Sequence, residues 1–213
     1  IHQPPRDAEL AQLESGTHPT QQRLAFEELL AHILCLQRLR DKARQEQAPV
    51  LKSSSRLVPD LLSSLPFELT RAQQRVYREV RENLSTAIPM LRLIQGDVGS
   101  GKTMIAILAA LQAVENDFQV AVMAPTEILA EQHFLNFSGF LENLGLEICY
   151  LSGKTKGKKR SAALEQIGSG QAQIIIGTHA LFQDEVSFNK LGLMVIDEQH
   201  RFGVHQRLAL REK

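Results

Sequence analysis

The stretch that decides the fold is residues 90–103, which read MLRLIQGDVGSGKT. Its first part has a short apolar run, Met90, Leu91, Leu93 and Ile94, of the kind that forms a buried strand. The second part begins at Gly96 and fits the phosphate-loop pattern G-x-x-x-x-G-K-[ST], which ends here at Lys102 and Thr103. A stretch with helical spacing follows. Strand, glycine loop and helix in this order are the context that the pattern requires, so the stretch predicts nucleotide binding.

The residue types of this loop suit a triphosphate. Glycines at positions 96, 99 and 101 allow the backbone to curl, so that successive N–H groups can point inward, and the following helix adds the positive end of its dipole. Lys102 is expected to reach the β- and γ-phosphates of ATP, and the Thr103 hydroxyl is expected to bind Mg²⁺. The expected nucleotide-binding residues of the loop are Gly96, Asp97, Val98, Gly99, Ser100, Gly101, Lys102 and Thr103.

Two acids follow the apolar run at residues 193–196. Such a pair alone is a weak signal, because many strands simply end in acidic residues in solvent. About a hundred residues after a phosphate loop, the pair predicts a catalytic site. Asp197 is expected to hold Mg²⁺, through water, and Glu198 is expected to position and deprotonate the attacking water. Lys102, Asp197 and Glu198 are therefore the predicted catalytic residues.

Short apolar runs alternate with helical stretches through the rest of the chain. This alternation predicts an α/β fold of the P-loop NTPase kind, in which helices cover both faces of a mostly parallel sheet and ligands bind at the carboxyl ends of the strands. The expected strands are 120–124, 146–151, 174–176 and 193–196, and the expected helices are 127–144 and 161–167.

Before the loop, the sequence predicts two further parts. Residues 1–64 read as a linker segment, extended over 1–19, with a long amphipathic helix over 20–44 whose apolar stripe must dock on another element. Residues 65–213 read as the nucleotide domain. Near its start, Thr70 and Gln73 fit a capping box at a helix start. The alternative is that Gln73 bonds an adenine edge, with Phe67 packed nearby.

Composition narrows the function classes. The chain has 24 basic and 24 acidic residues, so any nucleic-acid surface must be local. The run at residues 152–160 has five cations and no acid, and it is either a phosphate-binding loop or a solvated one. Cys35 and Cys149 have no metal spacing and are expected to be buried thiols in a reducing compartment, such as the cytoplasm. No apolar run reaches membrane-spanning length, and His133 is expected to be partly buried on its helix.

Four segments carry a family resemblance: GDVGSGKT at 96–103, APTEILAEQH at 124–133, GTHALF at 177–182 and DEQHRFGVHQR at 197–207. They resemble the first, RecA-like motor lobe of second-superfamily DNA helicases, and the RecG family of branched-DNA translocases in particular. The N-terminal stretch, with its long helix, is similar to the segment that joins the wedge domain to the motor in that family. A transcription-repair coupling translocase of the Mfd type, or a nucleotide-gated DNA-binding module without turnover, remain the alternatives.

The resemblance implies roles beyond those that the residues themselves suggest. It favours adenine recognition by Gln73 and Phe67, and it implies that Gln199 and His200 couple the ATP state to DNA. It also implies the partners: branched DNA, a second helicase lobe that carries an arginine finger, and a wedge domain. Without these, the chain is expected to bind ATP·Mg²⁺ weakly and to hydrolyse it poorly. The expected DNA contacts are Pro125, Thr126, Glu127, Gly177, Thr178 and His179, with Lys154, Lys156 and Lys158 of the basic loop.

Overall fold

The computed structural model describes residues 10–16, 18–45 and 47–198. The chain divides into two compact units, Ile1–Gln47 and Ala48–Lys213, and each is described by itself. Within the described residues, no helix combines the length and the apolar character that a membrane crossing needs.

The first unit is helical. It contains a short helix, α1 (Leu10–Glu14), in a segment that was expected to be extended, and a long helix, α2 (Pro19–Gln45), which confirms the helix predicted from the apolar spacing. The predicted apolar stripe of α2 is exposed rather than docked: the side chains of Phe26, Leu29 and Ile33 are all at least half exposed. Cys35 of this helix is also exposed, so the expectation of a buried thiol is wrong there.

The second unit is built on a four-stranded sheet. Its strands are β1 (Gln119–Met123), β2 (Ile148–Leu151), β3 (Ile174–Gly177) and β4 (Leu191–Ile196). Their order across the sheet is β2-β3-β1-β4, and every neighbouring pair is parallel. The predicted parallel α/β architecture is confirmed, and all four strands end at the same edge of the sheet.

Helices cover both faces of this sheet, as the apolar character of the strands requires. On one face α5 (Lys102–Glu115) packs against β1 and β4, and α6 (Glu127–Leu141), continued by η1 (Glu142–Leu144), packs against β2 and β3. The opposite face is covered by α7 (Gly157–Gly168) and η2 (His179–Phe182). Alternate residues of β1 point to the two sides: Val120 and Val122 join one core, and Ala121 and Met123 the other.

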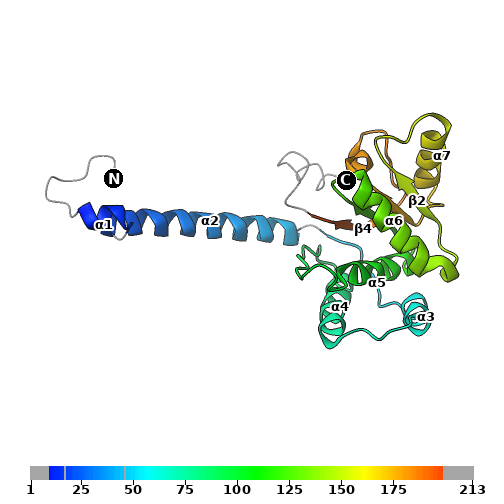
Figure 1. Ribbon diagram of the computed structural model, residues 1–213, viewed down its shortest axis with the longest axis horizontal. Coiled ribbons are helices and arrows are strands. Elements are labelled where there is room, and N and C mark those ends of the chain that lie inside the picture. Colours follow the sequence, from blue (N-terminus) through cyan, green and yellow to red (C-terminus); the bar gives the residue numbers. More distant parts are fainter. Residues whose placement is uncertain (1–9, 17, 46, 199–213) are drawn as a thin grey trace. The chain divides into compact units, whose positions relative to one another are not determined.

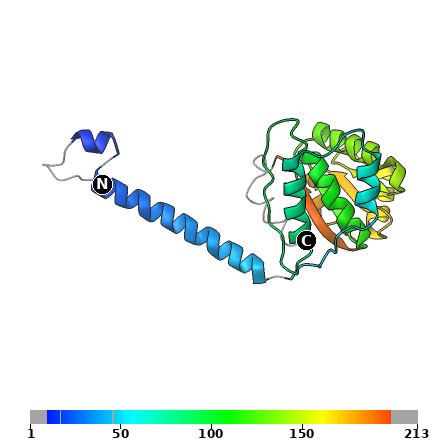
Figure 2. The ribbon, with the colours of Figure 1, turned by 90° about the horizontal axis from the view of Figure 1, so that it is seen from below.

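Two further helices, α3 (Leu57–Ser64) and α4 (Arg71–Leu84), pack on α5 on the side away from the sheet (Figures 1 and 2). Because α3 buries Leu57, Val58 and Leu61 in the core, the second unit begins at Ala48 rather than near Leu65, where the sequence placed it.

The strand predicted at residues 90–94 is wrong. These residues form an irregular segment that leads into the glycine loop. Met90 and Ile94 pack against the core, but Leu91 and Leu93 are each 76% exposed. A strand needs a neighbour that accepts its backbone hydrogen bonds as well as an apolar sequence. Among the described residues, β4 pairs with β1 alone, and residues 90–94 do not join its other edge.

Candidate functional site

The glycine loop has the backbone conformation that its sequence predicts. Gly99 and Gly101 have φ angles of 80° and 83°, in the left-handed region that glycine adopts without strain. Gly101 is the N-cap of α5, so Lys102 and Thr103 are the first residues of that helix. Their N–H groups lie in the first turn, where a helix has no internal acceptor for them. Loop and helix together therefore form the start of an anion-binding site.

In this structure Lys102 bonds to its own loop. Its Nζ atom donates to the carbonyl oxygens of Gly96, at 2.7 Å, and Asp97, at 2.8 Å. The ammonium group thus lies inside the curl of the loop, as a phosphate-binding lysine must. A bound phosphate oxygen would have to replace these carbonyls as its acceptor.

Gln73 joins helix α4 to the loop. The capping box is present: Gln73 N donates to Thr70 Oγ1 at 3.2 Å, and Thr70 N donates to Gln73 Oε1 at 2.8 Å. The other end of the same amide, Nε2, donates to Ser100 O at 3.0 Å. Both ends of the side chain are therefore used within the protein, whereas Phe67 is 47% exposed. Contact of Gln73 with an adenine would require one of these bonds to be exchanged.

Asp197 follows directly after β4, and three contacts fix its position. Its backbone N–H donates to Met123 O at 2.8 Å, which continues the ladder between β1 and β4. Its Oδ1 accepts from the N–H of Glu198 at 3.0 Å. Its Oδ2 lies 2.8 Å from Nε2 of His133, on α6. Glu198 is exposed and has a positive φ angle of 51°, which is rare for a residue with a side chain.

Loop and acids lie at the same edge of the sheet. Helix α5 ends at Glu115 and β1 begins at Gln119, so this short connection makes α5 run antiparallel to β1. Its first residues, Lys102 and Thr103, therefore lie toward the carboxyl end of the sheet. Because β4 is parallel to β1, Asp197 lies at that end as well. The sequence prediction that these groups share one edge agrees with the topology.

The residues at this edge fit a magnesium ion held mainly by a nucleotide. One carboxylate and one hydroxyl are hard oxygen ligands of the type that Mg²⁺ prefers, and Mg²⁺ usually takes few protein ligands beside phosphates and water. In the described part of the chain, no group of three or more His, Cys, Asp or Glu side chains could hold a metal by itself. Asp197 and Thr103 are the residues that would hold the ion.

The predicted DNA-facing residues also lie along this edge, but they differ in access. Thr126 caps α6, with its hydroxyl accepting from Leu129 N at 3.3 Å. Glu127 forms an ion pair with Lys154, so two predicted DNA contacts bind each other. Gly177 and Thr178 are buried, and Thr178 is only 2% exposed, so DNA cannot contact these two residues in this structure. His179 is exposed.

The basic loop divides into a fixed and an exposed part. Arg160 forms an ion pair with Glu185 and donates to the carbonyls of Ser152 and Thr155, at 3.4 and 3.5 Å, so it holds the loop in place. Lys156, Lys158 and Lys159 are exposed, and within residues 47–198 they form no ion pair. Lys156 is the N-cap of α7, and Lys158 and Lys159 lie in its first turn.

Some candidates cannot be placed. Gln199 and His200, predicted to couple ATP to DNA, lie outside the described residues. Among the missed residues, His133 is the clearest: the sequence suggested a partly buried helix position, and no local pattern indicates its contact with Asp197.

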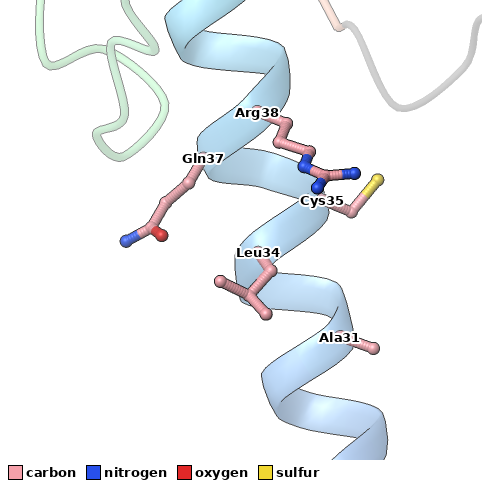
Figure 3. A pocket seen from close by; sticks show the side chains of 5 residues that line it. All are labelled: Ala31, Leu34, Cys35, Gln37 and Arg38. Atoms are coloured by element: carbon pink, nitrogen blue, oxygen red, sulfur yellow. The ribbon is translucent and has the colours of Figure 1, made fainter.

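A pocket on α2 involves none of the predicted residues. It is lined by Ala31, Leu34, Cys35, Gln37 and Arg38, all from one helix (Figure 3).

Comparison with known proteins gives a family match over most of the second unit. Residues 70–212 match the DEAD/DEAH box helicase family. Over all 213 residues the chain is 57% identical to the ATP-dependent DNA helicase RecG of Pasteurella multocida and 54% identical to that of Escherichia coli K12. The chain spans 31% of the length of each of these relatives.

Two solved helicase structures are also similar to this chain. A structure of RecG bound to a three-way DNA junction matches with a TM-score of 0.79 and 41% identity, over 85% of this chain and 25% of that one. The UvsW helicase from bacteriophage T4 matches with a TM-score of 0.55 over 78% of this chain and 57% of that one. Its identity is only 19%, so this second likeness concerns the fold alone.

Proposed function

The chain belongs to the DEAD/DEAH box helicase family, and on this premise we propose that it is the ATP-binding first motor lobe of a RecG-type helicase that remodels branched DNA. The proposal rests on one observation: the glycine loop, the start of α5 and Asp197 all lie at the same edge of the sheet. The strong likeness to RecG proteins over the whole chain favours a branched-DNA helicase over a transcription-repair coupling translocase of the Mfd type.

In the proposed site each residue has one task. The amides of the loop and the ammonium of Lys102 bind the phosphates, and Thr103 and Asp197 hold the magnesium ion, which supplies charge neutralisation at the phosphates. Glu198 orients a water molecule and accepts its proton. Gln73 and Phe67 contact the adenine. Gln199 and His200 transmit the state of the site to DNA.

Nucleotide binding by this chain is expected to be weak. The loop is closed on Lys102, so binding must break two hydrogen bonds to Gly96 and Asp97 before new ones form. Substantial turnover is expected only together with a second lobe, because an arginine finger contributes about 10³–10⁵ in rate in related nucleotidases. DNA-stimulated ATPase activity of this chain alone would contradict the expected need for a second lobe.

DNA contact is proposed for the exposed members of the predicted set. Lysines at the start of α7 lie at the positive end of its dipole, where each is unfavourable by about 0.3–1 kcal/mol. A phosphate backbone bound there would relieve this repulsion. The proposed contacts are Thr126, His179, Lys156 and Lys158, with Pro125, Glu127 and Lys154 beside them. The structure of RecG on a three-way junction supports branched DNA as the ligand class, and the bacterial relatives support the bacterial cytoplasm as the location.

The proposal is tested by titrating the chain with a fluorescent ATP analogue in the presence of Mg²⁺. Replacement of Lys102 by Ala should weaken binding at least about tenfold, since a charge-assisted contact to phosphate contributes about 1.5–3 kcal/mol. Lys190→Ala is the matched control, because Lys190 lies at the amino end of β4. Equal affinity of Lys102→Ala and the unchanged chain would overturn the nucleotide site.

A further inference from the structure

The side chain of His133 meets the acid that the proposed function assigns to magnesium. Nε2 of His133 and Oδ2 of Asp197 are 2.8 Å apart, and the two side chains are 15% and 32% exposed. With the Glu198 N–H on Oδ1, each carboxylate oxygen of Asp197 has a protein donor within 3.0 Å. A carboxylate oxygen has two lone pairs, so each can accept one more bond. The contacts therefore leave Asp197 able to bind a ligand and fix the direction in which it does so.

The surroundings of the ring assign its tautomer. Nδ1 of His133 is buried and has no hydrogen-bond partner among the described residues. A buried N–H without an acceptor is costlier than a bare lone pair, since unsatisfied donors are the rarer kind in proteins. We therefore assign an N–H to Nε2, which donates to Oδ2 of Asp197 at 2.8 Å.

The helix that carries His133 is itself fixed in place. His133 lies on α6, which begins at the Thr126 cap and packs into the core through Phe137 and Leu141, both at most 2% exposed. Asp197 is on β4, and His133 reaches it from a helix that covers β2 and β3. A rotation or shift of α6 would therefore change the position of a donor on Asp197.

We propose that His133 is a positioning residue: its Nε2–H holds one oxygen of Asp197 so that the carboxylate faces the hydrated magnesium of a bound nucleotide. This inference rests on the proposed nucleotide function. Ligands of metals commonly depend on such supporting hydrogen bonds, and their loss typically lowers metal affinity about 10–100-fold. The competing interpretation is that the contact only fastens α6 to the end of β4.

The test separates these interpretations by the ratio of affinities for a fluorescent ATP analogue measured with Mg²⁺ and with EDTA. His133→Leu, which removes the donor at similar volume, should lower this ratio about tenfold and leave the affinity in EDTA unchanged. A purely structural role would lower both affinities together or neither. Suppose that the unsubstituted chain binds the analogue more tightly with Mg²⁺ than with EDTA, and that His133→Leu shows the same ratio. The role of His133 would then be wrong, and the proposed nucleotide site would stand.

Two amide variants keep the test decisive even where His133→Leu fails to fold. Gln places an N–H donor at about the distance of Nε2, and Asn is one carbon shorter. His133→Gln should restore most of the Mg²⁺-to-EDTA ratio and His133→Asn should not; equal ratios in the two variants would overturn the inference. If the unsubstituted chain binds the nucleotide equally with Mg²⁺ and with EDTA, the proposed magnesium site itself is wrong.

Discussion

At the scale of single residues, the glycine loop depends on the close packing of Gly101 against the side chain of Gln73. Gly101 has a φ angle of 83°, and a Cβ at this position would clash with Nε2 of Gln73. The amide end of Gln73 could swing away, but it would then lose its bond to Ser100 O. The glycine is therefore required both by the backbone angle and by the contact between α4 and the loop.

Replacement of Gly101 by Ala should therefore lower the free energy of unfolding by about 1–3 kcal/mol, from the left-handed backbone and the lost hydrogen bond. Nucleotide affinity should fall as well, because the amides of the loop shift. Urea denaturation and nucleotide titration measure the two effects. The control is Gly139→Ala in α6, where no atom lies within 4 Å of the added Cβ and a helix gains about 0.5–1 kcal/mol. If both variants behave alike, the account of Gly101 is incorrect.

The residue-scale roles were only partly open to prediction from sequence. The capping box of Thr70 and Gln73 follows from local spacing, and the structure contains it. The bond from Gln73 to Ser100 and the contact of His133 with Asp197 join residues 27 and 64 positions apart. Such pairs are set by the order of strands and helices in space, and no spacing along the chain reveals them.

At the scale of elements, α3 starts with a cap that comes from another helix. Its N-cap residue, Arg56, has no side-chain cap bond. Instead the carboxylate of Glu115, at the end of α5, accepts from the N–H groups of Ser55, Arg56 and Leu57 at 2.9–3.0 Å and from the hydroxyls of Ser54 and Ser55. Burial raises the pKa of Glu115, but the hydrogen bonds from Ser54, Leu57 and Ser55 outweigh it and lower the pKa to about 2.

This lowered pKa predicts a pH-dependent stability. The folded chain holds the charged form of Glu115 more strongly than the unfolded chain, so the stabilisation is complete above a pH of 4.5 and is lost as the pH falls toward about 2. Glu115→Gln should lower the free energy of unfolding by about 1–2 kcal/mol at neutral pH, with solvent screening allowed for. The difference should shrink in urea denaturation at pH 3. A constant difference at both pH values would contradict the charged cap, and exposed Glu147→Gln serves as the control.

A buried glutamine connects three more elements. Gln119, the first residue of β1, is 4% exposed. Its Nε2 donates to the carbonyls of Ile167 and Ala172, at 2.9 and 2.8 Å, and its Oε1 accepts from the N–H groups of Asn189 and Lys190, at 2.7 and 3.1 Å. The end of α7, the start of β1 and the start of β4 are thus tied to one side chain.

Replacement of Gln119 by Leu should be among the most destabilising changes outside the apolar core. It leaves the carbonyl of Ala172 and the N–H groups of Asn189 and Lys190 without their partner, at about 1–3 kcal/mol for each buried group that water cannot reach. The carbonyl of Ile167 keeps the N–H of Gly170, at 3.1 Å. We expect a loss of at least about 3 kcal/mol in urea denaturation. The same change at exposed Gln171 should have little effect, and similar losses at both positions would show that the four bonds do not stabilise the fold.

The elements also mark where prediction from sequence fails. Helix α2 follows from the period of its apolar residues, the start of α4 from its capping box, and strands β1 and β3 from their short apolar runs. Four of the five residues at 90–94 are apolar, yet they form no strand, because pairing depends on a neighbour that the local sequence does not specify. Helix α3 lies in a segment whose sequence is compatible with a loop or a weak helix, because its cap, Glu115, lies 58 residues from Leu57.

At the scale of the whole second unit, the parallel sheet places all strand ends at one edge. The predicted nucleotide-binding residues lie in the glycine loop and after β4, and the predicted DNA contacts follow β1, β2 and β3. Helix α6 touches both sets, since its cap is Thr126 and its second turn carries His133. This shared helix offers a physical path by which DNA bound beside Thr126 would affect Asp197.

The exposed lysines at the start of α7 give the prediction that separates a DNA-binding loop from a solvated one. Lys156, Lys158 and Lys159 should be replaced together by Gln, and Lys154 left unchanged because it pairs with Glu127. Each phosphate contact contributes about 0.7–0.9 to the slope of log affinity against log salt, so the slope should fall by up to about 2–3. Binding should weaken most at low salt and alike for different DNA sequences, since these contacts read no bases.

The matched control replaces Lys52 and Lys190, which are also exposed but lie outside this loop. Net charge then changes in the same direction, so a general loss of attraction to DNA would alter both variants, whereas a local contact alters the slope in the first variant alone. An unchanged slope in the α7 variant would mean that these lysines are solvated. The cost of three cations at the positive end of a helix would then have no compensation from DNA, and the DNA-facing edge would be limited to the ends of β1 and β3.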